Sequence, residues 1–369
     1  MTRTAPRFTP LIASLPPTVP FVGPEAQQRA LGRPFRARLG ANESVFGPAP
    51  QAIEAMRAEA AEVWKYGDSE SHDLREALAA HHGVSRDNLV IGAGIDSLLG
   101  SLVRLLVTEG TPVVTSAGAY PTFNYHVHGY GGTLHTVPYR DDAEDPDALL
   151  AKAAEVDAPL IYFCNPDNPM GSWHSAGRVQ QMISALPEGA VLLLDEAYCE
   201  FAPEGTVPPV DVANPQVIRM RTFSKAYGMA GARIGYALGH ERLIGAFGLV
   251  RNHFGVNRVA QAGALAALHA TDWLGHVQAE VASARARIAA IGARNGLTAL
   301  PSATNFVCLD CGRDGDYARA LVGALAEEGI FVRMPFVAPE DRCIRVSAGT
   351  AGDLDAFAEG LPRALATIG

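Results

Sequence analysis

The chain has 369 residues, of which 48% are hydrophobic and 19% are charged, and its formal net charge is −9 at pH 7. This length and composition allow a large buried core in about two domains. The acidic residues are spread along the chain, and nothing supplies the basic surface that nucleic acids or anionic lipids require. We therefore expect neither a nucleic acid nor a membrane as a partner.

The N-terminal segment and the cysteines indicate where the protein works. MTRTAPRFTPLIASLPPTVPF has prolines where a signal peptide needs an unbroken apolar stretch, and no window reaches the length of a membrane span. The five cysteines are an odd number in apolar surroundings, which is typical of reduced thiols. Cys308 and Cys311 have the C-x-x-C spacing, but no second pair completes a metal set, so we expect core cysteines and no metal. These features predict a cytoplasmic protein.

In chain order, short apolar runs alternate with alanine-rich helical stretches, which is the pattern of an α/β fold. Residues 1–40 form a proline-rich arm. Residues 41–268 form a large sheet domain with strand-like runs that are mostly apolar throughout, as strands covered on both faces are. These runs are NLVIGAG, TPVVTS, GTLHTVPY, PLIYFCN, AVLLLDEAY, QVIRMRTFS and IGYALG. In residues 269–369 long helices alternate with short strands, which predicts a smaller α+β domain that packs with the arm.

The first motif is a turn from strand to helix, VIGAGIDSLLGSLVRLL. Backbone N–H groups near Gly94, Ile95 and Asp96 would face an anion at the N-terminus of that helix. The spacing also imitates a dinucleotide-binding fingerprint. However, Ser97 stands at the third glycine position, and no second strand ends in an acidic residue about twenty positions on. A phosphate cradle is therefore the preferred interpretation.

Two later strands end in polar residues. PLIYF is followed by CNPDNPMGS, whose Asn-Pro pairs enforce a rigid turn that either aims Asn168 at a ligand or is a plain turn. AVLLLDEAY carries Asp195 at the end of its hydrophobic run, with Tyr198 shortly after. A buried carboxylate is costly unless a cation pairs with it, and the pyridinium nitrogen of pyridoxal phosphate is such a cation.

The segment RTFSKAYGMAGARIGYALG holds one lysine, Lys225, at the carboxyl end of a predicted strand, where open α/β sheets bind ligands. A partly desolvated pocket with other cations would lower the pKa of this amine and prepare it to attack a carbonyl. A surface lysine with its charge in water is the alternative that this segment alone leaves open. Arg233, with Thr222 and Ser224, would complete a phosphate site, since a guanidinium binds phosphate oxygens bidentately.

Taken together, NPDNPMG, DEAYCEF and RTFSKAYGMAGARIGY resemble the fold-type-I, pyridoxal-phosphate-dependent aminotransferases of classes I and II. Within them, the closest pattern is the histidinol-phosphate aminotransferase group. The similarity runs from ANESVFGPAP at residue 41 to CIRVSAGT at residue 350. It implies an aspartate-aminotransferase-like fold, with a large, mostly parallel seven-stranded sheet and a smaller α+β domain. It also implies a homodimer with shared active sites.

The resemblance assigns roles around the cofactor, pyridoxal 5'-phosphate. Lys225 would form the Schiff base and move the proton between the substrate α-carbon and the cofactor. Asp195 would pair with the ring nitrogen, while Asn168 and Tyr198 would bond the phenolic oxygen. Tyr120 would stack on the ring face.

The same resemblance assigns residues to two anions, the cofactor phosphate and the anionic group of the substrate. The cofactor phosphate would be bound by Gly94, Ile95, Asp96, Thr222, Ser224 and Arg233, and by Tyr66 of the other subunit. The anionic group of the substrate would be bound by Arg345 with Arg333 as its companion, next to Asn168. For Arg333, a structural salt bridge is an equal alternative.

Departures from the subgroup concern the substrate. Phe21 stands at a substrate-binding position where histidinol-phosphate enzymes often have a tyrosine, and Phe46 also lacks a hydroxyl. Met170 replaces the usual threonine, and Trp173 and His174 follow it. A pocket for an apolar or aromatic amino acid tolerates these changes better than a pocket for a phosphate ester, so the amino donor stays open.

Three functions are compatible with these residues. The leading one is transamination, in which the cofactor carries an amino group from an amino acid or amino-alcohol phosphate to a 2-oxo acid. The second is decarboxylation or elimination with the same fold and cofactor, as in the similar threonine-phosphate decarboxylases. The third is a non-catalytic cofactor-binding regulatory module, against which the missing basic DNA-binding extension counts. We expect transamination.

Overall fold

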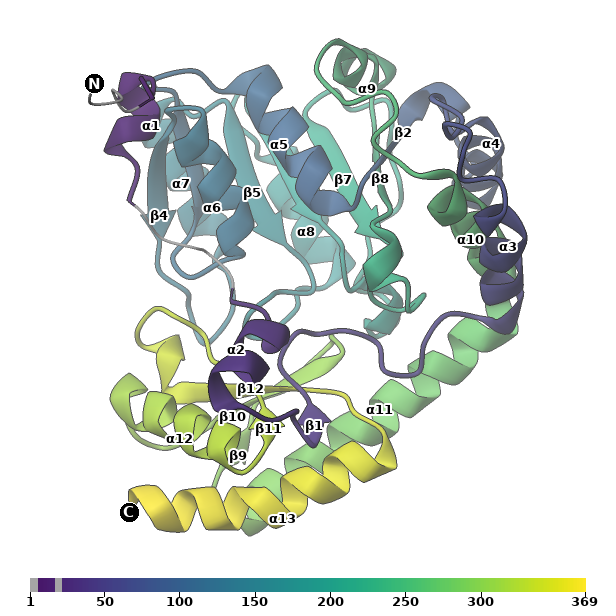
Figure 1. The fold of residues 1–369 in the computed structure, drawn as a ribbon. Helices are drawn as coiled ribbons and strands as arrows, with labels where there is room; N and C mark the ends of the chain where they lie inside the picture. The colour runs from purple at the N-terminus through teal and green to yellow at the C-terminus, as the bar shows by residue number, and fades with distance from the viewer. Residues whose placement is uncertain (1–5, 17–21) are drawn as a thin grey trace, which may run out of the picture.

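The structure is a computed structural model that describes residues 6–16 and 22–369. Its main sheet has seven strands in the order β2-β8-β7-β6-β5-β3-β4 (Figure 1). Only β8 runs antiparallel to its neighbours, so the predicted mostly parallel sheet is confirmed. The strands are β2 (Leu89–Gly92), β3 (Pro112–Ser116), β4 (Thr133–Val137), β5 (Leu160–Cys164), β6 (Val191–Asp195), β7 (Val217–Thr222) and β8 (Gly235–Gly239).

Each of the seven strand-like runs contains one of these strands, and helices explain why the runs are apolar on both faces. Alternate residues of a strand point to opposite faces. In β5, Tyr162 belongs to the core cluster under α5 and α6, whereas Ile161 and Phe163 pack with α7 and α8. These helices are α5 (Ile95–Leu106), α6 (Pro121–Gly129), α7 (Pro146–Val156) and α8 (Ala176–Ser184).

A second group of helices covers the β2 end of the sheet. Leu89, Ile91 and Leu238 form a core with residues of α3, α4 and α10. These helices are α3 (Pro50–Ala60), α4 (His72–His82) and α10 (Arg258–His269), and the short α9 (Glu241–Ala246) follows β8. In Figure 1 the long helix α11 (Thr271–Arg294) leads from α10 to the lower half of the molecule.

That lower half contains a small antiparallel sheet in the order β12-β10-β9. It is flanked by α11, α12 and α13 (Figure 1). The elements are β9 (Thr298–Ala299), β10 (Phe306–Asp310), β12 (Cys343–Ser347), α12 (Gly315–Glu327) and α13 (Ala351–Ile368). No described helix is long and apolar enough to cross a membrane.

The N-terminal arm contacts this C-terminal part through a two-stranded parallel pair. β1 (Ala37–Arg38) pairs with β11 (Ile330–Phe331). Two helices precede it, α1 (Pro10–Ser14) and α2 (Pro24–Leu31). The division at residues 40 and 268 stays a prediction, although α10 ends and α11 begins next to the second boundary.

Candidate active site

A cavity of about 480 Å³ lies where the carboxyl ends of β5, β6 and β7 meet the start of α5 and the small sheet. Parallel neighbours bring these ends together, because Cys164 is paired with Asp195 and Asp195 with Met220. Most of the predicted site residues line this cavity. They are Ile95, Asp96, Tyr120, Asn168, Asp195, Tyr198, Thr222, Ser224, Lys225, Arg233, Arg333 and Arg345.

Three predicted residues have other positions. Gly94 is the N-cap of α5, directly before Ile95, and is not among the residues that line the cavity. Tyr66 is 80% exposed and does not line the cavity of its own chain. Phe21 lies outside the described residues.

Lys225 follows β7 in a turn, and its Nζ donates a hydrogen bond to the backbone oxygen of Asn42 at 3.1 Å. Burial, together with the positive charge of Arg345, lowers the pKa of this amine to about 8. An amine with that pKa can both hold and release a proton near neutral pH. Lys225 thus lies in one cavity with Arg233, Arg333 and Arg345, which is the kind of environment that the sequence predicted for this amine.

Asp195 ends β6 and is 3% exposed. Its Oδ1 accepts a hydrogen bond from the backbone N–H of Ala197 at 3.0 Å, and its Oδ2 accepts one from the hydroxyl of Tyr162 at 2.8 Å. Burial raises the pKa of the carboxyl to about 6, while these two hydrogen bonds oppose the rise. The carboxylate can thus pair with a cation that enters the cavity.

Sequence reasoning missed Tyr162, which lies on the same face of β5 as Cys164. The only signal was a hydroxyl inside an otherwise apolar strand. It also missed Asn42, which is 3% exposed and donates to Tyr198 Oη through its Nδ2 at 3.1 Å. Asn42 lies in the quoted motif ANES, but nothing in that motif shows what it contacts.

A cradle for an anion forms at the start of α5. Gly94 has φ +79°, and a Cβ added there would lie 2.4 Å from Nη2 of Arg233. The guanidinium therefore lies directly beside the first turn of the helix. Its Nη1 donates to Ser224 Oγ at 3.4 Å, and Nη2 lies 3.6 Å from the carboxylate of Asp96, which also accepts the hydroxyl of Tyr120.

This cradle and the carboxylate of Asp195 fit the two charged ends of pyridoxal phosphate. The backbone N–H groups that open a helix, a guanidinium and two hydroxyl side chains suit a phosphate. The buried carboxylate in the same cavity suits a protonated ring nitrogen. Since Lys225 lines this cavity as well, the residues present fit the cofactor.

Two arginines enter the cavity from the small sheet and the segment beside it. Arg345 is in β12, where its Nη1 donates to Asn168 Oδ1 and its guanidinium lies 5.2 Å over the ring of Phe306. Arg333 exchanges backbone hydrogen bonds with Arg345. Burial, together with Arg345, lowers the pKa of Arg333 to about 10. Like charges brought together in this way favour an anionic ligand between or beside them.

The departures noted in the sequence lie mostly outside the wall. Met170 is 1% exposed and packs with Cys308 and Cys343. Phe46 packs against the main core. Neither residue lines the cavity, and Trp173 and His174 do not line it either. The side chains of these four residues are therefore not part of the described cavity wall.

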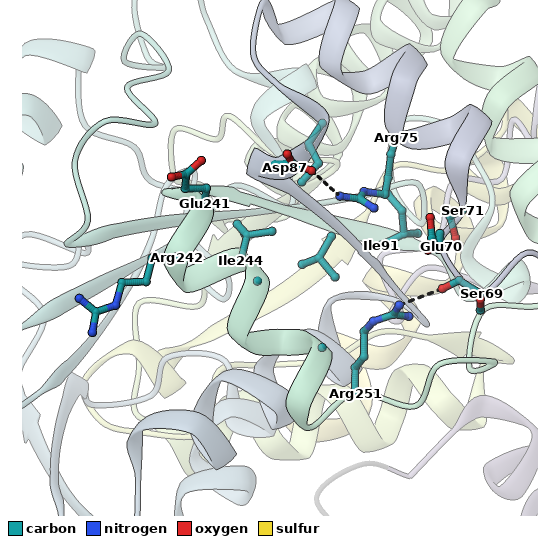
Figure 2. A pocket seen from close by; sticks show the side chains of 14 residues that line it. Ser69, Glu70, Ser71, Arg75, Asp87, Ile91, Glu241, Arg242, Ile244 and Arg251 are labelled. Carbon is teal, nitrogen blue, oxygen red and sulfur yellow. Dashed lines mark hydrogen bonds and ion pairs between the residues drawn. The ribbon is translucent and has the colours of Figure 1, made fainter.

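A second pocket, of about 400 Å³, lies beside β2 and α9 (Figure 2). Arg75 lies 3.8 Å from the carboxylate of Asp87, and Arg251 donates to the backbone oxygen of Ser69 at 2.9 Å. The described residues that line it include three arginines and three acidic residues, and neither lysine nor histidine is among them. Its charges are balanced, so the cavity around Lys225 is the candidate active site.

Known aminotransferases match nearly the whole chain. The family model for class I and II aminotransferases matches residues 37–361. The histidinol-phosphate aminotransferase of Moorella thermoacetica is 31% identical over 98% of this chain and 94% of its own length. That of Anaeromyxobacter sp. is 35% identical over 89% of this chain and 90% of its own length.

Solved structures agree with these sequence matches. The histidinol-phosphate aminotransferase of Sinorhizobium meliloti, solved in complex with pyridoxal-5'-phosphate, is 54% identical with a TM-score of 0.97, and the match covers 100% of both chains. A mutant of the Thermus thermophilus aspartate aminotransferase is 23% identical with a TM-score of 0.81, over 98% of this chain and 100% of that chain. The second likeness shows the fold alone.

Proposed function

The chain belongs to the class I and II aminotransferases and uses pyridoxal phosphate, and we propose that its amino donor is histidinol phosphate. The observation that carries the proposal is the pair of arginines, Arg333 and Arg345, in the same cavity as Lys225. A 2-oxo acid takes the amino group in the second half of the reaction. We also propose a cytoplasmic location, for which the five free thiols are suited.

When bound, pyridoxal phosphate supplies an electron sink for the charge that develops at the substrate α-carbon. Arg233 and the first turn of α5 would bind its phosphate, together with the hydroxyls of Thr222 and Ser224. Asp195, in its ionised form, would pair with the ring nitrogen. Asn168 and Tyr198 would donate hydrogen bonds to the phenolic oxygen, and Tyr120 would pack on the ring.

Lys225 is the group that moves the proton. With a pKa of about 8, its amine could accept a proton from the substrate carbon next to the amino group and would then donate that proton to the carbon that has taken up the amino group. Arg345 supports this role because its positive charge helps to keep the lysine amine neutral. The positive charge of Arg345 thus favours both the binding of the substrate anion and the neutral form of Lys225.

The two arginines orient the substrate. A phosphate ester carries about two negative charges at neutral pH, and a guanidinium fork binds phosphate oxygens bidentately. Arg345 and Arg333 can share such a dianion, because both side chains line the same cavity. The side chains of Phe46 and Met170 do not line the cavity, so they do not disfavour this substrate.

We further propose a homodimer in which Tyr66 contacts the cofactor phosphate of the partner subunit. Tyr66 is 80% exposed and its ring lies 4.8 Å from that of Phe254, which is 54% exposed. Trp64 and Leu249 are more than three-quarters exposed as well. Large exposed apolar side chains of this kind mark protein interfaces.

A single-turnover experiment tests the donor. The cofactor-loaded protein is mixed with histidinol phosphate, histidinol or an aromatic, aliphatic or basic amino acid, and the loss of its visible absorption is followed. We expect histidinol phosphate to react roughly tenfold or more faster than histidinol, which lacks only the phosphate. Arg345→Gln should remove most of this difference.

Other outcomes would contradict the proposal. Equal rates for histidinol and its phosphate would show that the arginines do not bind phosphate. A faster reaction with aromatic amino acids would identify the other donor class that the sequence left open. Carbon dioxide released from an amino acid would indicate decarboxylation.

A further inference from the structure

We propose that Asn42 is a positioning residue, which points the hydroxyl proton of Tyr198 and the amine of Lys225 into the cavity. The inference rests on the proposed roles of Tyr198 and Lys225 toward the cofactor. Asn42 lies between β1 and α3, so it belongs to neither sheet that carries the site. It is nevertheless 3% exposed and lines the cavity.

Asn42 makes five hydrogen bonds, through its backbone and through its side chain. Its backbone oxygen accepts from Lys225 Nζ and from Asn305 Nδ2, both at 3.1 Å. Its Nδ2 donates to Tyr198 Oη at 3.1 Å. Its Oδ1 accepts from Ser347 Oγ at 2.8 Å, and its backbone N–H donates to the same Oγ at 3.1 Å.

This arrangement decides where protons point. Ser347 Oγ accepts from the backbone N–H, so its own proton is available to Oδ1, and the amide of Asn42 must then face Tyr198 with its NH₂ group. An NH₂ group can only donate. Tyr198 Oη is therefore an acceptor in this contact, and its single proton is left to be donated to another group. Under the proposed function, the acceptor of this proton would be the phenolic oxygen of pyridoxal phosphate.

Backbone conformation accounts for the contact with Lys225. Asn42 has φ +54°, in the left-handed region, where asparagine is tolerated better than most side chains. In this conformation its carbonyl oxygen holds the amine of Lys225 while its side chain reaches Tyr198. Glycine adopts the same conformation at no steric cost, so Asn42→Gly keeps the carbonyl and removes only the amide.

The same residue connects the cofactor-binding groups to the substrate-binding sheet. Asn305 directly precedes β10, and Ser347 ends β12, the strand that carries Arg345. Both contact Asn42, which in turn contacts Lys225 and Tyr198. A displacement of β12 would therefore move Asn42. The side chain of Asn42 would transmit the movement to Tyr198, and its carbonyl would transmit it to Lys225.

A double-mutant cycle tests the inference. The measurement is the pH midpoint of the visible absorption change of the cofactor-loaded protein without substrate. Losing a hydrogen-bond donor makes an anionic oxygen more basic, so Tyr198→Phe should raise this midpoint. Asn42→Gly should raise it by about one pH unit, and it should add almost nothing in the Tyr198→Phe background.

Two further variants separate positioning from loosening. Ser347→Ala leaves Asn42 in place but frees its amide to rotate, so it should raise the midpoint by a smaller amount. Asn88→Ala removes another buried amide, which binds the backbone oxygen of Gly239, and it should leave the midpoint unchanged. If Asn42→Gly does not fold, the same double-mutant cycle can be measured with Ser347→Ala and Tyr198→Phe. In that cycle, Ser347→Ala should raise the midpoint only while the Tyr198 hydroxyl is present.

Either of two results would overturn the inference. One is a wild-type midpoint in Asn42→Gly and Ser347→Ala. The other is a shift of equal size with and without the Tyr198 hydroxyl, which would mean that Asn42 acts independently of it. A wild-type protein that takes up no pyridoxal phosphate would instead overturn the proposed function, and the inference with it.

Discussion

Lys225 and Asp195 line the same cavity, and burial moves both toward the neutral form. The pKa of the amine falls to about 8, and that of the carboxyl rises to about 6. Each group therefore carries a desolvation cost that an oppositely charged ligand would offset. A single cofactor with a reactive carbonyl and a basic ring nitrogen addresses both groups, which is why perturbed pKa values of this kind mark functional sites.

The first residue-scale prediction concerns the pH dependence of cofactor uptake. Only the neutral amine of Lys225 can attack a carbonyl, so the rate at which apoprotein takes up pyridoxal phosphate should rise with pH through a midpoint of about 8. Arg345→Gln removes a positive neighbour and should move this midpoint upward. Stopped-flow absorbance measures the rate, and Arg178→Gln, which breaks an ion pair with Asp147, is the control. An unchanged midpoint in Arg345→Gln would exclude the coupling.

A second prediction tests how Tyr162 supports Asp195. Tyr162→Phe removes the hydrogen bond to Oδ2, so the pKa of Asp195 should rise further above about 6. As pH falls, the carboxyl would then protonate earlier, and the protein should release its cofactor at a higher pH than the wild type. Dialysis at stepwise lower pH, followed by absorbance, measures this. Tyr236→Phe removes a buried hydroxyl that contacts His82 and should release cofactor like the wild type.

At the scale of elements, the start of α5 shows how a local sequence pattern becomes a site. The glycine-rich turn after β2 predicted a helix N-terminus facing an anion, and α5 begins at Ile95. What completes the cradle is Arg233, which reaches the same place from the turn before β8. Neighbouring strands bring the two turns together, since β2 pairs with β8 over its whole length.

This close approach gives a prediction for Gly94. Gly94→Ala would place a Cβ 2.4 Å from the guanidinium of Arg233, so the arginine must move away from the cradle. Cofactor affinity should fall by roughly tenfold or more, the cost of a charge-assisted hydrogen bond. Gly110→Ala is a matched control, because Gly110 has the same φ of +79° but open space around its Cβ.

Equilibrium titration with pyridoxal phosphate measures both variants. Each costs about 1 to 2 kcal/mol of backbone strain, so their thermal stabilities should fall by similar amounts. Equal affinities of Gly94→Ala and Gly110→Ala for pyridoxal phosphate would contradict the prediction. They would show that the close approach of Arg233 to Gly94 does not affect cofactor binding.

At the scale of the whole molecule, one chain contains almost all of the predicted site. Among the described residues, Tyr66 is the predicted phosphate ligand that lies far from the cavity of its own chain, because it is on the surface with Phe254. A homodimer resolves this if the exposed apolar residues form the interface, since a twofold axis then brings each Tyr66 to the partner's cavity. One chain alone would leave its cofactor phosphate short of one contact.

Mixing two inactive variants tests this arrangement. Lys225→Ala and Tyr66→Ala each damage a different half of a shared site. In a hybrid dimer one site carries both changes and the other carries neither, so random pairing should restore about a quarter of wild-type activity. No recovery after subunit exchange, with hybrid dimers shown to be present, would argue that each site belongs to one chain.

Local sequence patterns predicted the fold class and the family, which are confirmed, and they singled out most of the residues that line the candidate active site. Seven apolar runs predicted seven strands because strands buried on both faces must be apolar, and Lys225, Asp195 and Arg233 stood out because charged groups rarely adjoin such runs. Tertiary structure decided the supporting contacts. Tyr162 reaches Asp195 across 33 positions, and Asn42 reaches Ser347 across 305. Such pairs depend on strand order and register, which local patterns do not encode, so the residues that orient the site become visible only in the folded chain.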